Sequence, residues 1–414
     1  MKRLLIAAGG GGDAITAAMV HTALHGADAP ALVLTYAWER LVVDPVPGPR
    51  RTADFTGTET AAQDLALVTA ATAPVAPAGS LIPRLAAELG PRIGLLDPYG
   101  GTLGLARQIT AAAHWCGADR IDLVDVGGDI VANGDEPTLR SPLGDALALA
   151  ACAATGIATA VHVAGPGLDN EVPLPDLLPR LGEPTFALTA AHTEGVRGVF
   201  DWHPSEASAL LVAAARGIRG VCGTRDAPRP VLLDDAARQV HRLTLERALA
   251  LNPLARALAG CTGLDDAEEA SRAVCGFSEI ERERHRATRS GVPRPARTPN
   301  GAAPPGTAPL GTPGPGRPAR DPATVLARFA DWERGLLAAG LAYVTTRRIT
   351  EELDLDDAEA RSLLGTLRAG RPRRHAPPLW RLAGAGADRE CEADHAGQAR
   401  SDSGSIGKGV ARWN

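Results

Sequence analysis

Glycine and acidic residues occur together at three places early in the chain. The first group is Gly9, Gly10, Gly11, Gly12 and Asp13, which directly follows an apolar run. The second group is Asp97, Gly100 and Gly101, and the third is Asp125, Gly127, Gly128 and Asp129. Glycine amides can approach an anion closely, and carboxylate oxygens are the ligands that hard divalent cations prefer. These residue types therefore favour a site for a small anionic ligand and a metal ion.

The third group contains the most residues that could bind a metal ion or take part in catalysis. It continues through Asp135 and Glu136 to Ser141, which with Pro142 predicts the start of a helix. We expect Mg²⁺ or Mn²⁺ at Asp125, Asp129, Asp135 and Glu136, because few lysines lie nearby to neutralise these carboxylates. Asp129 and Asp125 are the candidate catalytic groups, together with His162 at the end of a predicted strand. The alternative is that these residues only form solvated turns, with His162 as a hydrogen-bonded core residue.

The first group also has the spacing of a dinucleotide-binding loop. Gly9, Gly11 and Ala14 satisfy G-x-G-x-x-A. However, no acidic residue ends the second predicted strand, since Glu39 lies beyond it, and Asp13 occupies the helix start where a pyrophosphate would bind. We therefore do not expect NAD at this loop, and Asp13 has the alternative role of capping its own helix.

Apolar runs alternate with Ala- and Leu-rich stretches of helical periodicity as far as about residue 290. This alternation predicts a Rossmann-like, three-layer α/β domain with a parallel sheet. The expected strands are 3–8, 31–36, 92–96, 121–126, 157–163, 185–188, 217–221 and 230–233. Because loops that follow parallel strands emerge at one edge, we expect the three groups to converge there.

Four regions follow from the composition along the chain. We expect the α/β domain at 1–290, a Pro/Gly-rich linker at 291–321, a small helix-turn-helix or winged-helix module at 322–383, and a disordered tail at 384–414. The second helix of the module would begin with Asp356, Asp357 and Glu359, and acidic residues there would be repelled by DNA phosphates. We therefore favour contact with a protein partner or a second copy of the chain over contact with nucleic acid.

The overall composition excludes several classes of protein. The formal charge is −5 and 45% of residues are hydrophobic, which indicates a globular protein without long-range attraction for nucleic acid. Glycines and Asp13 interrupt the first apolar run, and no other uncharged run approaches membrane-spanning length. The six cysteines are scattered without zinc-ligand spacing. We expect a cytoplasmic protein that does not contact a membrane.

Two stretches carry a family resemblance. AAGGGGDAITAA and LVDVGGDIVANGDEPTLRSPLGDALALAA resemble a family of prokaryotic proteins known only as a domain of unknown function, and the resemblance covers most of residues 1–290. Residues 125–134 also resemble a Gly-Asp-Gly-Gly-Asn-Glu-Ile-Gly segment of D-glutamate cyclases, although Asp129 replaces the Asn/Glu pair. This second resemblance implies a metal-assisted reaction.

Two main hypotheses remain open at this point. The first is a metal-assisted lyase, cyclase or hydrolase that acts on a small anionic metabolite. The second is a ligand-sensing regulatory protein whose C-terminal module contacts DNA or a protein partner. A purely structural protein is a third reading, which predicts no response to metals or nucleotides.

Overall fold

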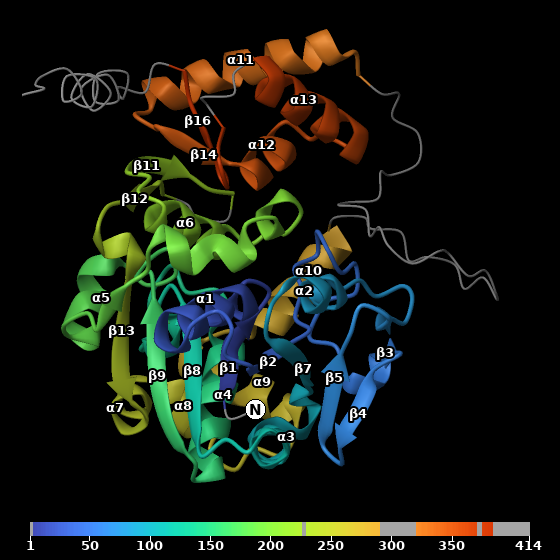
Figure 1. Ribbon diagram of the computed structural model, residues 1–414, viewed down its shortest axis with the longest axis vertical. Coiled ribbons are helices and arrows are strands. Elements are labelled where there is room, and N and C mark those ends of the chain that lie inside the picture. The colour runs from blue at the N-terminus through green and yellow to red at the C-terminus, as the bar shows by residue number, and fades with distance from the viewer. Residues whose placement is uncertain (1–2, 226–228, 290–319, 371–374, 384–414) are drawn as a thin grey trace, which may run out of the picture.

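The computed structural model describes residues 3–225, 229–289, 320–370 and 375–383 (Figure 1). We call 3–289 the α/β domain and 320–383 the C-terminal module. The linker expected at 291–321 lies outside the described residues except for its last two positions. The tail expected at 384–414 lies outside them entirely.

A mostly parallel sheet forms the centre of the α/β domain, as the sequence predicts, and it has nine strands. Its strand order is β10-β13-β9-β8-β1-β2-β7-β5-β4. The parallel strands are β9 (Ala158–Ala164), β8 (Arg120–Val126), β1 (Leu4–Gly10), β2 (Leu32–Tyr36) and β7 (Arg92–Leu96). Antiparallel edge strands, which the sequence prediction missed in part, are β5 (Leu65–Val68), β4 (Glu59–Ala62), β13 (Gln239–Thr244) and β10 (Phe186–Ala187).

The register of β1 brings two of the glycine-aspartate groups together. Leu4 pairs with both Leu32 of β2 and Ile121 of β8. Strands β1 and β8 therefore run side by side in the same direction and end at the same edge of the sheet. Residues 9–13 and 125–129, which follow or end these strands, are neighbours for this reason.

Helices cover both faces of the sheet, which gives the three layers (Figure 1). One face carries α3 (Gly101–Cys116), α4 (Pro142–Thr155), α7 (Leu245–Leu251), α8 (Pro253–Ala257) and α9 (Leu264–Cys275). The other face carries α1 (Asp13–His25), α2 (Ile82–Glu88) and α6 (Glu206–Ala215). Helices α5 (Leu174–Leu181) and α10 (Glu279–Arg289), and the short strands β3 (Phe55–Thr56) and β6 (Ala73–Pro74), complete the domain.

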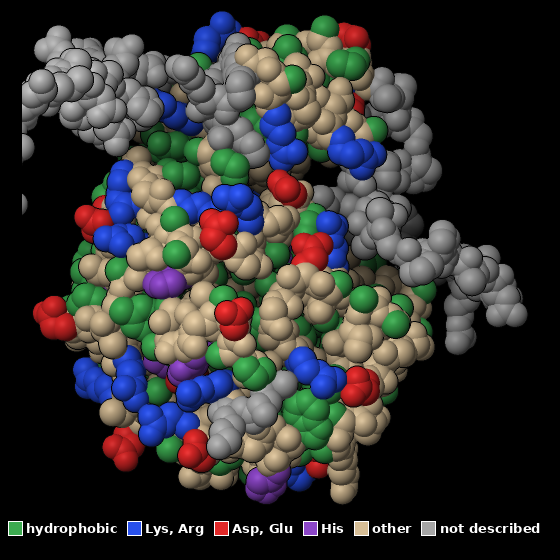
Figure 2. Space-filling view, viewed as in Figure 1, with side chains coloured by type: hydrophobic (Ala, Val, Ile, Leu, Met, Phe, Trp, Pro, Cys, Tyr) green, Lys and Arg blue, Asp and Glu red, His purple; other side chains and the backbone are tan. Residues whose placement is uncertain are grey.

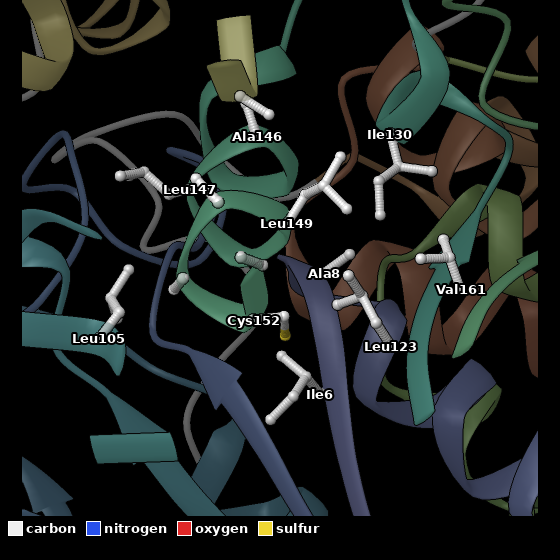
Figure 3. Packing of buried hydrophobic residues seen from close by; sticks show 14 of the residues in the cluster. Ile6, Ala8, Leu105, Leu123, Ile130, Ala146, Leu147, Leu149, Cys152 and Val161 are labelled. Atoms are coloured by element: carbon white, nitrogen blue, oxygen red, sulfur yellow. The ribbon is translucent and has the colours of Figure 1, made fainter. Parts of the chain in front are cut away.

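Alternation along β1 separates the two apolar cores. Ile6 and Ala8 point towards α4, where Figure 3 shows them beside Cys152. Leu5 and Ala7 pack on the opposite face. This period of two is the pattern of a strand that is buried on both sides. The apolar α4 and the fully buried β1 therefore hold the site residues at their ends on rigid elements.

The C-terminal module is joined to the α/β domain by a second sheet. Its strand order is β12-β11-β14-β16-β15, formed by β12 (Val231–Leu233), β11 (Gly220–Gly223), β14 (Tyr343–Thr345), β16 (Leu379–Arg381) and β15 (His375–Ala376). We had expected 217–221 and 230–233 in the main sheet, and that expectation is wrong, because β11 pairs in parallel with β14 of the module. The helices of the module are α11 (Pro322–Ala338), α12 (Thr346–Glu352) and α13 (Asp357–Gly370).

Polar contacts also cross this junction. Arg225 Nε lies 2.9 Å from Glu351 Oε2, and Arg368 Nη2 lies 3.3 Å from Asp201 Oδ1. Figure 2 shows basic and acidic side chains close together along the same boundary. Within the described residues, we find no helix whose length and apolar character would let it cross a membrane.

Candidate metal and ligand site

A cavity of about 170 Å³ lies where β1 and β8 end. Main-chain and side-chain atoms from both glycine-aspartate groups line it, together with residues from distant parts of the chain. The lining includes Gly9, Gly10, Gly11, Gly12, Asp13, Arg40, Asp125, Asp129, Arg140, Ser141, Asp145, Asp169, Glu171, His203, Ser205, Glu206, Thr224, Glu279 and Arg347. Of the described side chains, nine carboxyls and three arginines line the cavity.

Three aspartates form a compact cluster in this cavity. Asp13 is the first residue of α1, Asp125 is the second-last residue of β8, and Asp145 is in the first turn of α4. Each offers one carboxylate oxygen, and the three oxygens lie within 4.8 Å of one another. All three residues are buried. The cluster therefore places three hard oxygen ligands around one point, as a divalent cation requires.

Two oxygens of this cluster are buried without a hydrogen-bond partner among the described residues: Asp125 Oδ2 and Asp145 Oδ1. Asp13 is better satisfied, since its Oδ2 accepts the Gly9 amide at 2.7 Å. Burial raises the pKa of Asp13 to about 7. For Asp125 and Asp145, burial and the negative charge of neighbouring aspartates raise the pKa well above the ordinary value of an aspartate. Buried acceptors without donors are costly. A bound cation would satisfy them, so the residues present fit a metal ion.

Further acids surround the three-aspartate cluster. The Asp129 carboxyl shares a hydrogen bond with Asp125, and burial with its acidic neighbours raises its pKa well above the ordinary value. Burial raises the pKa of Asp169 and of Glu279 to about 8. This surplus of carboxyls holds protons when no cation is present, because ionising all of them together is unfavourable.

Ser141 does not cap its helix as we had expected. Its hydroxyl donates instead to Glu171 Oε1 at 2.6 Å, and its amide donates to Glu171 Oε2 at 2.8 Å. The Leu143 amide at the start of α4 donates to Glu279 Oε2 at 2.9 Å. Ser141 therefore lines the cavity and holds Glu171, and its role in ligand binding stays a prediction.

The glycines of the first group are explained largely by close packing. A Cβ on Gly9 would lie 2.5 Å from Asp13 Oδ2, and a Cβ on Gly12 would lie 1.9 Å from Ser205 Oγ. At Gly10 a Cβ would lie 2.7 Å from the Trp38 carbonyl oxygen. Gly11 differs, since it has φ of +63° and open space around it. The loop thus makes room for side chains of the protein itself, and Gly11 faces free volume.

His203 contributes a neutral hydrogen-bond donor to the wall. Its Nδ1 accepts the Ser205 amide at 3.2 Å, so the proton of the neutral ring is on Nε2. Nε2 is buried and has no partner among the described residues. Burial lowers the pKa of His203 to about 3. At neutral pH this side chain can therefore donate a hydrogen bond to a ligand without carrying charge.

The second glycine-aspartate group does not join the other two. Asp97 accepts the amides of Thr52 at 3.0 Å and Tyr99 at 3.1 Å, and a Cβ on Gly101 would lie 2.6 Å from the Cys261 carbonyl oxygen. Neither these residues nor Gly100 are among those that line the cavity. The three loops were expected to converge, and two of them do. The Asp97 loop instead makes hydrogen bonds to nearby backbone amides and packs against the loop before α9.

Other predicted residues also lie outside the cavity lining. Glu136 Oε1 pairs with Arg180 Nη1 at 2.7 Å, and Asp135 accepts from the Asn133 amide nitrogen Nδ2 at 2.9 Å. His162 Nε2 lies 3.0 Å from Asp122 Oδ1 inside the sheet. Gly127 and Gly128 have φ near +115°, and they pack against Asp169 and Leu177. These residues position the loop or stabilise the core.

Several site residues were missed from the sequence. Asp145 is a lone acid in the apolar stretch 143–154, and this isolation was the available signal. Asp169, Glu171 and Glu279 lie in loops or at a helix start with no local pattern, and only the tertiary fold brings them to the cavity. Arg347 comes from the C-terminal module, which we had treated as separate.

Comparison with known proteins gives one match. The model of a family described as "protein of unknown function (DUF1152)" matches residues 4–287. No curated protein and no solved structure matches the chain. The match covers more than half of the chain and includes both groups that form the cavity. The chain belongs to the DUF1152 family.

Proposed function

We propose that this protein is a divalent-cation-dependent enzyme that acts on a small anionic metabolite. The observation that carries the proposal is the cluster of Asp13, Asp125 and Asp145, whose buried oxygens converge within 4.8 Å. Two of the buried carboxylate oxygens have no donor among the described residues. Mg²⁺ or Mn²⁺ bound there would polarise a carbonyl or phosphoryl oxygen and lower the pKa of a bound water.

The residues around the cluster support chemistry at the same point. Asp129 lines the cavity next to its hydrogen-bond partner Asp125, which suits it to exchange a proton with a ligand there. His203 offers a neutral Nε2–H, and Gly10 and Gly11, whose backbone carries further amide donors, line the same cavity. These donors suit the oxygens of an anionic substrate. A lyase, cyclase or hydrolase reaction fits this set of groups.

Cation binding by the full-length chain tests the proposal. Mn²⁺ titration followed by electron paramagnetic resonance should show a bound ion in the wild type. Asp145→Asn should weaken Mn²⁺ binding by at least about tenfold, since it removes one charged ligand. Asp64→Asn is the matched control, because Asp64 is an exposed acid in the turn between β4 and β5. Equal Mn²⁺ affinity in the wild type and Asp145→Asn would refute the metal site.

A ligand-sensing regulator is the second candidate, because the module reaches the cavity. Thr345 donates to Glu206, which also lines the cavity. The module has the element order helix, strand, helix, helix and hairpin, which is typical of a winged helix. A sensor predicts that Mn²⁺ changes amide hydrogen exchange along α13. An enzyme without this role predicts protection at the cavity alone.

A further inference from the structure

Helices α1 and α6, which lie on the same face of the sheet, both begin at the cavity (Figure 1). Their starts are in direct contact, because the Ser208 hydroxyl in the first turn of α6 donates to the Gly12 carbonyl oxygen at 2.9 Å. Residues 9–13 and 203–207 line the cavity. The positive ends of two helix dipoles therefore lie at the same cavity.

The start of α6 has no side-chain cap. Ser205 directly precedes this helix, but its side chain does not accept a hydrogen bond from the amides of the first turn. The Ser205 hydroxyl donates instead to Ser208 Oγ at 3.2 Å. Ala207, the second residue of the helix, lines the cavity. Because the first amides of a helix have no partner within the helix, an uncapped start can donate hydrogen bonds to an anion.

His203 adds a side-chain donor beside this helix start. Its Nε2–H is buried without a hydrogen-bond partner among the described residues, and the residue is only 6% exposed. Because burial lowers the pKa of His203 to about 3, the ring is neutral at pH 7. A buried donor without an acceptor is costly. An oxygen of a bound ligand would satisfy it.

The acidic residues at the two helix starts are already engaged by other groups. The Glu206 carboxylate accepts the Arg225 amide at 2.8 Å and the Thr345 hydroxyl. Asp13 accepts the Gly9 amide and belongs to the three-aspartate cluster. A divalent cation at that cluster would offset the negative charge of its ligands. With the cation bound, the start of α6 can therefore attract an anion.

We propose that His203 and the first turn of α6 form an oxyanion subsite of the cavity. The His203 Nε2–H and the Ala207 amide donate to oxygens of a phosphate or similar group of the ligand, and its other oxygens contact the cation at the three-aspartate cluster. This inference rests on the proposed metal site. It identifies the ligand as a metabolite with an oxyanion group that neutral donors recognise.

Phosphate binding to the full-length, Mg²⁺-saturated protein tests the inference. Isothermal titration with inorganic phosphate should give a Kd for the wild type. His203→Ala should raise that Kd by at least about fivefold, because a hydrogen bond to the ligand is lost. His203→Gln should recover part of the affinity, since its side-chain amide keeps an N–H donor. Mn²⁺ affinity measured without phosphate should stay within about twofold in both variants, because neither change removes an oxygen ligand.

Nuclear magnetic resonance of protein that contains isotope-labelled histidine reports the contact directly. The Nε2–H signal of His203 is the one that disappears in His203→Gln. Phosphate added to the Mg²⁺-saturated wild type should move this signal downfield, since the proton then lies in a charge-assisted hydrogen bond. His192→Gln is the matched control, because His192 Nδ1 also accepts a backbone amide, at 3.2 Å, but His192 is not among the residues that line the cavity. Its phosphate Kd should equal that of the wild type.

Ser205→Asp tests the helix start without changing His203. An aspartate at this position can accept the amides of the first turn and adds a negative charge where the oxyanion would bind. The phosphate Kd should therefore rise by at least about tenfold. Ser205→Asn is the control of equal size, and its phosphate Kd should rise less because asparagine is uncharged.

Four results would overturn the inference. They are wild-type phosphate affinity in a folded His203→Ala variant, wild-type phosphate affinity in Ser205→Asp, a His203 signal that phosphate does not move, and no phosphate binding to the Mg²⁺-saturated wild type. Failure of the metal site has a different signature, since Asp145→Asn would then keep the Mn²⁺ affinity of the wild type. The two proposals can therefore fail separately.

Discussion

Replacing Asp13 by asparagine should stabilise the protein when no divalent cation is present. Burial raises the Asp13 pKa from its ordinary 3.8 to about 7. At ~1.4 kcal/mol per pKa unit, ionising this carboxyl destabilises the fold by ~4 kcal/mol above pH 7. The side-chain carbonyl of the new asparagine could keep the bond from the Gly9 amide, but burying its NH₂ group has its own cost. We expect a net gain of ~2–4 kcal/mol at pH 8.

The pH dependence gives this prediction its sign. Between 3.8 and about 7 the folded wild type binds a proton at Asp13 that the unfolded chain has released. Wild-type stability should therefore fall as pH rises through this window and then level off. The Asp13→Asn variant does not lose stability in this way. Its gain in stability over the wild type should therefore be small at pH 4.5 and complete above pH 7.

Urea unfolding in EDTA at pH 4.5, 6 and 8, followed by tryptophan fluorescence, measures the difference. Adding Mn²⁺ at 100 times its Kd should remove most or all of the variant's advantage, because binding to the folded state stabilises the wild type by ~2.7 kcal/mol and the variant much less. Asp64→Asn is the control for loss of one surface charge. A variant that is less stable than the wild type at pH 8 in EDTA, or a gap that does not change with pH, would refute this account of the cluster.

Three further predictions concern the loop, the protons and the module. Gly12→Ala should lower the free energy of unfolding by ~2–3 kcal/mol, because its Cβ would meet Ser205 Oγ. Gly11→Ala should lower it by only ~1–2 kcal/mol, because the cost there comes from the positive φ alone. Urea titration distinguishes the two variants. Mn²⁺ affinity should rise between pH 6 and pH 8, because cation binding releases protons from carboxyls that have a pKa of about 7 or 8 owing to burial. Calorimetry in buffers of different ionisation enthalpy detects this proton release. Arg320→Ala should destabilise α13 by ~1–3 kcal/mol, because Glu359 would lose its ion pair, and amide exchange along α13 should accelerate.

Sequence reasoning could predict the parts of the fold that depend on local pattern. The β1 run and the turn into α1 identify a strand-to-helix unit, and parallel pairing then places Asp13 near Asp125. The edge strand β13 was missed, since its sequence QVHRLT has no continuous apolar run. Strand β11 looked like another sheet strand, but its partner is β14, more than a hundred residues later. Nothing local encodes that pairing.

The site was harder to predict because chemistry and packing use the same residues. The four glycines suggested a phosphate loop, yet three of them make room for a carboxylate, a serine hydroxyl or the backbone at residue 38. Asp97 looked equivalent to Asp125, but it is satisfied by two local amides. Only the balance of hydrogen bonds distinguishes them, and Asp125 Oδ2 remains unsatisfied among the described residues. Which hydrogen bonds each carboxylate makes can be read only from the three-dimensional structure.

The charge of the cavity also fixes the order in which its ligands can bind. Because the surplus carboxyls hold protons when no cation is present, the cavity has no strong positive charge for a free oxyanion beside the glycine loop, whereas a divalent cation can bind by displacing those protons. A cation at Asp13, Asp125 and Asp145 then becomes the largest positive charge near the glycine loop. Phosphate should therefore bind after the cation, and titrating phosphate in EDTA should give no measurable heat. Equal phosphate affinity with and without Mg²⁺ would mean that the acidic cluster and the anion site are independent.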